Sequence, residues 1–167
     1  MRVGTFWQVV VVMSRATGTA QGPPDSWAGR PYLCWPLISM LALGPLPTSA
    51  AFARSHTRDV LAEWRLPVDL VRDAEMLVSE LSTNALRATW SLREAMPIAL
   101  WLLANHQRLT IEVWDCHPGD PVRRPAAADA ENGRGLAIVE AYSNRWGVRR
   151  ATSRVKAVWC ELLIRAD

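Results

Sequence analysis

Residues 68–89 read VDLVRDAEMLVSELSTNALRAT, the most regularly patterned stretch of the chain. Apolar residues recur there at helical spacing, at Val71, Ala74, Leu77, Val78, Leu81, Ala85 and Leu86. This periodicity predicts an amphipathic helix that packs its apolar face on a sheet. Ser82, Thr83 and Asn84 are mediocre helix formers in the middle of this pattern, which indicates that something other than helix formation selects them.

The sequence before this helix predicts a strand and another helix. WPLISMLALGPLP (35–47) is typical of a short apolar strand closed by glycine and proline. Thr48 is then placed to cap a helix that runs to about Trp64, and the dipeptide Leu66-Pro67 separates that helix from the next.

The sequence after the helix predicts two antiparallel hairpins around a loop and a third helix. Residues 97–104 and 109–114 pair most simply as a hairpin, and residues 146–150 and 155–164 as a second one. Between them, HPGDPVRRPAAADAENGRG (117–135) is too rich in proline and glycine to be regular, so we expect a mobile lid that ends at a helix start. The element order predicts an α+β fold: a two-layer α/β sandwich whose mostly antiparallel sheet is covered by three helices.

Composition predicts one domain without membrane or nucleic-acid binding. With 167 residues and 50% hydrophobic content, we expect a disordered N-terminal extension over residues 1–34 and a single domain over 35–167. The apolar run at 6–13 is too short to cross a bilayer and lacks a signal cleavage site. Three cysteines without CxxC spacing favour a reducing cytoplasm. The net charge of +3 comes from scattered arginines, so direct nucleic-acid binding is not expected.

Three groups of polar or glycine residues stand out on the predicted helices and strands. Glu80 and Asn84 leave the same helix face one turn apart, and Asp115 ends a strand. Gly133, Arg134, Gly135 and Leu136 open the third helix, where free N–H groups attract anions. Taken singly, each feature has an ordinary structural reading: a solvated helix face, an aspartate that starts a turn, and a glycine-rich loop that lacks Walker or Rossmann spacing.

The order of the three features is more specific. VSELSTNALRAT, VWDCHPGDP and NGRGLAIVEAYSNRWG resemble the N, G1 and G2 boxes of the histidine-kinase-like ATPase superfamily. The closest branch contains bacterial anti-sigma-factor serine/threonine kinases and short ATP-binding regulators of actinomycete type. The resemblance covers roughly residues 35–164 and implies the Bergerat α/β sandwich.

The resemblance also implies a role for each residue that matches a motif. Glu80 would be the general base, Asn84 would hold Mg²⁺, and Asp115 would accept the adenine amino group of ATP. Gly119 would leave space beside the base. The residues that would close over the phosphates are Gly133, Arg134, Gly135 and Leu136.

The sequence departs from the family pattern near the base pocket. His117 stands where the first G1 glycine is usual, and Ala88 replaces a histidine that often follows the N box. Val155 and Ala157 replace the glycine and the hydroxyl residue that often flank the lysine between them. These changes put turnover, lid closure and the details of the adenine pocket in question.

Two functional classes follow, with a third disfavoured. The first is a serine/threonine protein kinase that phosphorylates a small anti-sigma antagonist and otherwise sequesters a sigma factor. The alternative is a nucleotide-dependent protein-binding module with little or no catalysis. A sensor histidine kinase would need a dimerisation helix pair with a phosphoacceptor histidine, which residues 1–34 do not supply. A homodimer is expected only from the family.

Overall fold

The computed structural model describes residues 11–15, 35–92, 96–121 and 135–165. They form six strands and three helices in the described part of the chain. In chain order these are β1 (Val11–Arg15), β2 (Leu37–Leu43), α1 (Ser49–Glu63), α2 (Val68–Trp90), β3 (Ile98–Ala104), β4 (Arg108–Asp115), α3 (Gly135–Tyr142), β5 (Arg145–Arg150) and β6 (Lys156–Leu163).

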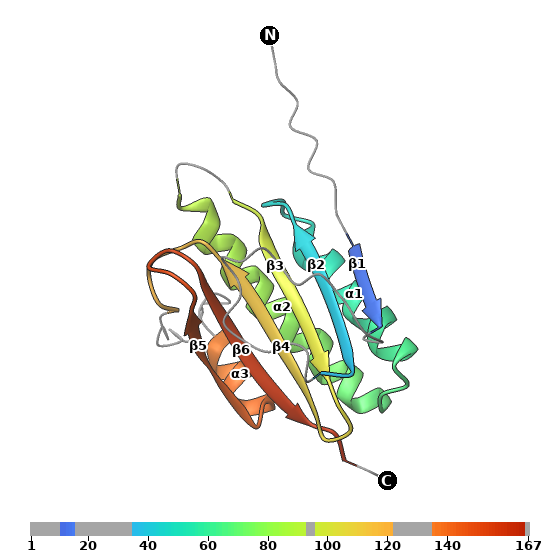
Figure 1. The fold of residues 1–167 in the computed structure, drawn as a ribbon. Coiled ribbons are helices and arrows are strands. Elements are labelled where there is room, and N and C mark those ends of the chain that lie inside the picture. Colours follow the sequence, from blue (N-terminus) through green and yellow to red (C-terminus); the bar gives the residue numbers. More distant parts are fainter. Residues whose placement is uncertain (1–10, 16–34, 93–95, 122–134, 166–167) are drawn as a thin grey trace.

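The strands make one antiparallel sheet with the helices against one of its faces (Figure 1). The strand order is β1-β2-β3-β4-β6-β5, and every neighbouring pair is antiparallel. The predicted α+β two-layer sandwich is confirmed, including both hairpins and the helix between them.

The core lies between α2 and the central strands. The predicted apolar face of α2 is buried from Ala74 to Leu86, whereas Val71 at its start is only half-buried. Leu77 and Leu81 pack in one cluster with apolar side chains of the sheet, among them Leu100 of β3 and Ile111 of β4. Each fully buried leucine contributes about 1.5–3 kcal/mol of burial free energy, so α2 is fixed along its length and its polar side chains are held beside the sheet.

The start of α1 differs in detail from the prediction. Thr48 occupies the N-cap position, but its side chain makes no capping hydrogen bond. Its backbone is already helical, with φ −79° and ψ −12°, whereas a capping side chain needs an extended residue that can fold back over the first turn. The neighbouring Ser49 hydroxyl instead donates to the carbonyl oxygen of Gly44 at 2.6 Å, which ties the helix start to the end of β2.

The structure describes one element in the predicted N-terminal extension. Residues 11–15 form β1, which is an edge strand of the sheet and pairs with β2 from Val11 opposite Leu41 to Arg15 opposite Leu37. Residues 1–10 and 16–34 lie outside the described residues. The domain boundary near residue 35 therefore stays a prediction.

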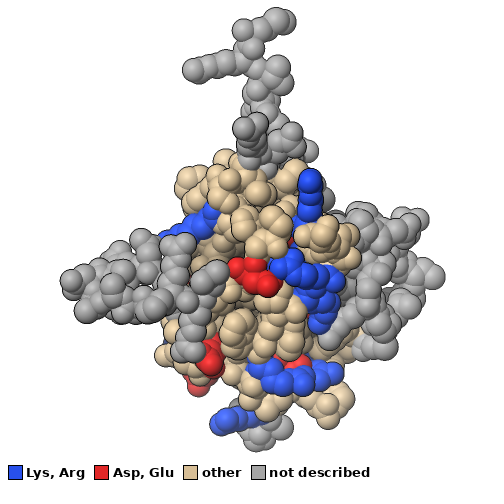
Figure 2. Space-filling model, turned by 90° about the vertical axis from the view of Figure 1, so that its left-hand side faces the viewer, with Lys and Arg blue, Asp and Glu red and all other residues tan. Residues whose placement is uncertain are grey.

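The distribution of charge and the length of the helices bear on the expected absence of nucleic-acid and membrane binding. On the side of the molecule that Figure 2 draws, basic side chains stand in separate groups with acidic ones nearby and do not merge into a continuous stripe. None of the described helices is both long and apolar enough to cross a membrane.

Candidate functional site

A pocket of about 420 Å³ opens between α2, the turn after β4, the start of α3 and the start of β6. Five predicted site residues line it: Asn84, Asp115, Gly119, Gly135 and Leu136. The structure therefore brings together residues that are up to 52 positions apart in the sequence. Gly133 and Arg134 fall outside the described residues, so their predicted contacts with phosphate stay predictions.

The glycine at the start of α3 touches the polar pair on α2. A Cβ atom added to Gly135 would lie 2.7 Å from Oε2 of Glu80 and 3.0 Å from Nδ2 of Asn84, both closer than ordinary contact. Only glycine leaves room for this approach, because any other residue would push against a carboxylate or an amide. Glu80 and Asn84 are half-buried and project from α2 towards the N-terminal end of α3.

Asp115 closes the other side of the pocket in a buried ion pair. The residue is 3% exposed at the end of β4, and its Oδ1 atom accepts from the backbone N–H of His117 at 2.8 Å. The same oxygen accepts from Nζ of Lys156 at 2.5 Å. Lys156 lies opposite Asp115 in the β4–β6 ladder, and its ammonium also donates to the carbonyl oxygen of His117 at 2.8 Å.

Lys156 is a site residue that sequence reasoning did not single out. It lines the pocket and is 2% exposed, although lysine is almost never fully buried without a partner. Two signals were present in the sequence. Of the 19 lysine and arginine residues in the chain, Lys156 alone is a lysine, and it stands directly before the apolar run Ala157–Cys160.

The neighbouring thiol is not set up for chemistry. Burial raises the pKa of Cys116, the charge of Asp115 raises it further, and the charge of Lys156 opposes this only in part. A raised pKa keeps the sulfur as a thiol at neutral pH, and the thiol is a poor nucleophile. Cys116 is therefore not expected to act as a nucleophile beside Asp115 and Lys156.

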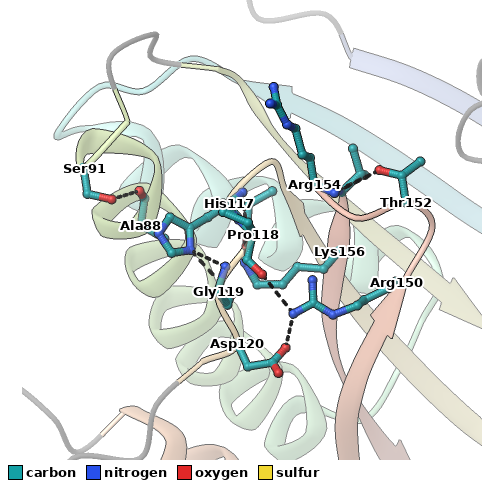
Figure 3. Close-up of polar contacts among 12 residues, drawn as sticks. Ala88, Ser91, His117, Pro118, Gly119, Asp120, Arg150, Thr152, Arg154 and Lys156 are labelled. Atoms are coloured by element: carbon teal, nitrogen blue, oxygen red, sulfur yellow. Dashed lines mark hydrogen bonds and ion pairs between the residues drawn. The ribbon is translucent and has the colours of Figure 1, made fainter.

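The turn after β4 folds back on itself and is tied to β5 (Figure 3). Nδ1 of His117 accepts from the N–H of Gly119 at 3.0 Å, and a Cβ at Gly119 would meet Cε1 of the same imidazole at 2.8 Å. The guanidinium of Arg150 donates to the carbonyl oxygen of Pro118 at 3.0 Å and pairs with Asp120. Only glycine at position 119 leaves room for the ring of His117 in this position. The predicted place of Gly119 beside the adenine base stays a prediction.

The pocket has the groups that a magnesium nucleotide needs. Asp115 offers a buried acceptor for an amine, and the N-terminal end of α3 offers backbone donors and positive dipole for an anion beside Asn84. In the part of the chain that the structure describes, no three His, Cys, Asp or Glu side chains gather to hold a metal. A divalent ion here would accordingly need oxygens of the ligand together with the neutral oxygen of Asn84. The close approach of Gly135 to Asn84 therefore fits a divalent ion that is bound together with a nucleotide.

Two comparisons with known proteins bear on this site. A family model described as "Histidine kinase-like ATPase domain" matches residues 44–160. The matched range runs from the residue after β2 into β6 and contains the whole pocket lining. The search of curated proteins gave no significant match.

Proposed function

This chain belongs to the histidine kinase-like ATPase family, and we propose that it is a regulatory protein that binds Mg-ATP in the pocket between α2 and β6. The observation that carries the proposal is the pocket itself, which has the carboxylate of Asp115 on one side and the Glu80–Asn84 pair under Gly135 on the other. Its volume of about 420 Å³ falls within the range of about 300–1,000 Å³ that is usual for sites of small ligands and cofactors.

The ends of the pocket would take different parts of the nucleotide. Asp115 would accept the amino group of adenine, with Gly119 beside the base. Asn84 would be the protein ligand of Mg²⁺, which neutralises charge on the phosphate oxygens when bound. Gly135 and Leu136 at the start of α3 would face the phosphates, together with Gly133 and Arg134.

We further propose that the protein is a serine/threonine kinase of anti-sigma-factor type. Glu80 would take the proton from a serine or threonine hydroxyl of a small antagonist protein. Its carboxylate lies against the glycine that begins α3, on the same helix face as Asn84. Phosphoryl transfer depends mainly on positioning and charge neutralisation, and a placed base adds about 10²–10⁴-fold.

A specific observation supports the second candidate, a nucleotide-dependent binding module with little or no catalysis. The imidazole of His117 lines the pocket at a position where the family usually has glycine. In either case the proposed partners are a sigma factor or its antagonist, the proposed location is the cytoplasm, and a homodimer is a further proposal from the family.

Isothermal titration with Mg-ATP tests the nucleotide site. We expect binding by the wild-type protein, no detectable binding by Asp115→Ala, and loss of Mg²⁺ dependence in Asn84→Ala. Asp69→Ala removes an exposed carboxylate at the start of α2 and serves as the matched control with wild-type affinity. Thermal unfolding of each variant shows whether it is folded. Wild-type affinity in a folded Asp115→Ala variant would refute the assignment of Asp115.

Glu80→Gln separates the two candidate functions, because it keeps the size of the side chain and removes the base. Slow ATP turnover by the wild-type protein that falls about 10²–10⁴-fold in this variant, with ATP affinity unchanged, would support the kinase. Binding without any turnover in both proteins would support the binding module.

A further inference from the structure

We propose that Lys156 is a positioning residue that sets base selectivity: it turns Asp115 so that one oxygen faces the pocket, and the pair together selects a 6-aminopurine over a 6-oxopurine. The inference rests on the proposed nucleotide site and adds a residue and a selection rule to it. It is carried by the ion pair that joins the end of β4 to the start of β6.

The two carboxylate oxygens of Asp115 have different surroundings. Oδ1 accepts both hydrogen bonds that the structure gives to this carboxylate, from Lys156 and from the backbone of His117. Among the described residues nothing donates to Oδ2, and this atom is not among the polar atoms sealed from solvent without a partner. Because Asp115 lines the pocket, Oδ2 is the oxygen left for a ligand.

Lys156 also fixes the charge of that oxygen. Asp115 is 3% exposed, and a buried charge without a partner is strongly disfavoured. The adjacent ammonium compensates the charge, and both groups are hydrogen-bonded, as a buried ion pair requires. Asp115 can therefore remain an acceptor for a neutral amine.

The ammonium brings a donor next to this acceptor. It has three N–H bonds, of which two go to Oδ1 of Asp115 and to the carbonyl oxygen of His117. The described residues supply no partner for the third, and Lys156 lines the same pocket. An acceptor beside a donor complements adenine, whose amine donates and whose N1 accepts. Hypoxanthine has the reverse pattern, so its carbonyl oxygen would face the carboxylate.

Titration of the full chain with Mg-ATP and with Mg-ITP, the hypoxanthine analogue, tests this selection. We expect the wild-type protein to favour ATP by at least about 10- to 150-fold, the range for one unmet hydrogen bond to a charged group. Lys156→Met keeps the length of the side chain and removes the charge. We expect it to lose at least about tenfold in ATP affinity and most of the preference for ATP.

The ratio of the two affinities separates positioning from a purely structural role. A variant that only loosens the fold should weaken ATP and ITP binding alike. Loss of Lys156 should weaken ATP binding more than ITP binding, because the oriented acceptor and the donor beside it are lost together.

The double variant Asp115→Asn/Lys156→Met covers the case in which the single variant does not fold. It replaces a charged pair with a neutral one and leaves no buried charge uncompensated. Its amide can turn a donor towards the pocket, so we expect ITP to bind at least as well as ATP.

Three outcomes would overturn the inference. Unchanged or tighter ATP binding by Lys156→Met, with the preference for ATP intact, would overturn the inference alone. A wild-type preference for ATP that persists in the folded double variant would do the same. A wild-type protein that binds neither nucleotide would overturn the proposed function and this inference with it.

Discussion

Replacing Gly135 by alanine should impair Mg-ATP binding while the protein stays folded. The added Cβ would lie 2.7 Å from Oε2 of Glu80 and 3.0 Å from Nδ2 of Asn84, whereas ordinary contact begins at 3.4 Å. Both atoms end side chains that are only half-buried and can rotate away. The strain is therefore relieved by moving the two groups that the proposed site depends on.

The expected loss of folding stability can be compared with the expected loss of binding free energy for Mg-ATP. Overpacking costs about 1–3 kcal/mol, and Gly135 is the first residue of α3, where the interior preference for alanine over glycine does not apply. The loss in unfolding free energy should therefore stay below about 3 kcal/mol. A displaced hydrogen bond to a charged group costs about 1.5–3 kcal/mol, which is about 10- to 150-fold in affinity. We expect a melting temperature lowered by a few degrees and Mg-ATP affinity lowered by at least about tenfold.

The assay is calorimetric titration with and without Mg²⁺, alongside thermal unfolding. Gly147→Ala is the matched control, since its Cβ would lie 3.0 Å from the ring of Trp159 and neither residue lines the pocket. The control should lower the melting temperature and leave nucleotide affinity unchanged. A Gly135→Ala protein with full Mg²⁺-dependent affinity would show that the close approach of α3 to α2 has no part in binding.

Two further predictions concern the turn after β4 and the pH dependence of stability. Arg150→Ala removes an exposed ion pair worth about 0–1 kcal/mol, so the melting temperature should barely change. Amide hydrogen exchange at Gly119 and Asp120 should become faster, because Arg150 no longer holds the turn. Unchanged exchange would show that Arg150 does not hold the turn in place. Burial lowers the pKa of His56 below its usual 6.5, and Asp59 opposes this only in part. Stability should therefore be lost as the pH falls below about 6.5 through the pKa of the folded state, because the unfolded chain binds the proton more tightly. Thermal unfolding of His56→Gln between pH 5 and 7 should show a flatter profile, and an equally steep one would assign the loss to other groups.

Periodicity predicted most of the fold because burial on one face leaves a direct trace in the sequence. The spacing of Leu77, Leu81 and Leu86 identified the buried side of α2. Apolar segments joined by turn-like residues identified β3 to β6. β1 was not predicted, because the short apolar run at 6–13 gives no indication of the strand it pairs with. Pairing along an edge strand depends on tertiary contacts that a single sequence segment does not show.

The candidate site was predicted to the extent that its residues lie in motifs. Asn84 and Asp115 stand at recognisable places on a helix and at a strand end, and both line the pocket. Lys156 was missed because its importance comes from register: only the pairing of β4 with β6 puts it opposite Asp115. The hydrogen bond from Gly119 to the ring of His117 could not be predicted from the sequence either, because it depends on the conformation of one turn.

The scarcity of lysine has a practical consequence for labelling experiments. Lys156 has the only ε-amine among the 19 basic residues of the chain, and it lies in the pocket wall. An amine-selective reagent followed by peptide mass mapping can therefore modify one internal position, which is easily distinguished from the α-amino group at the N-terminus. The rate of that modification measures how often the wall of the pocket opens, without an introduced tag or fluorophore.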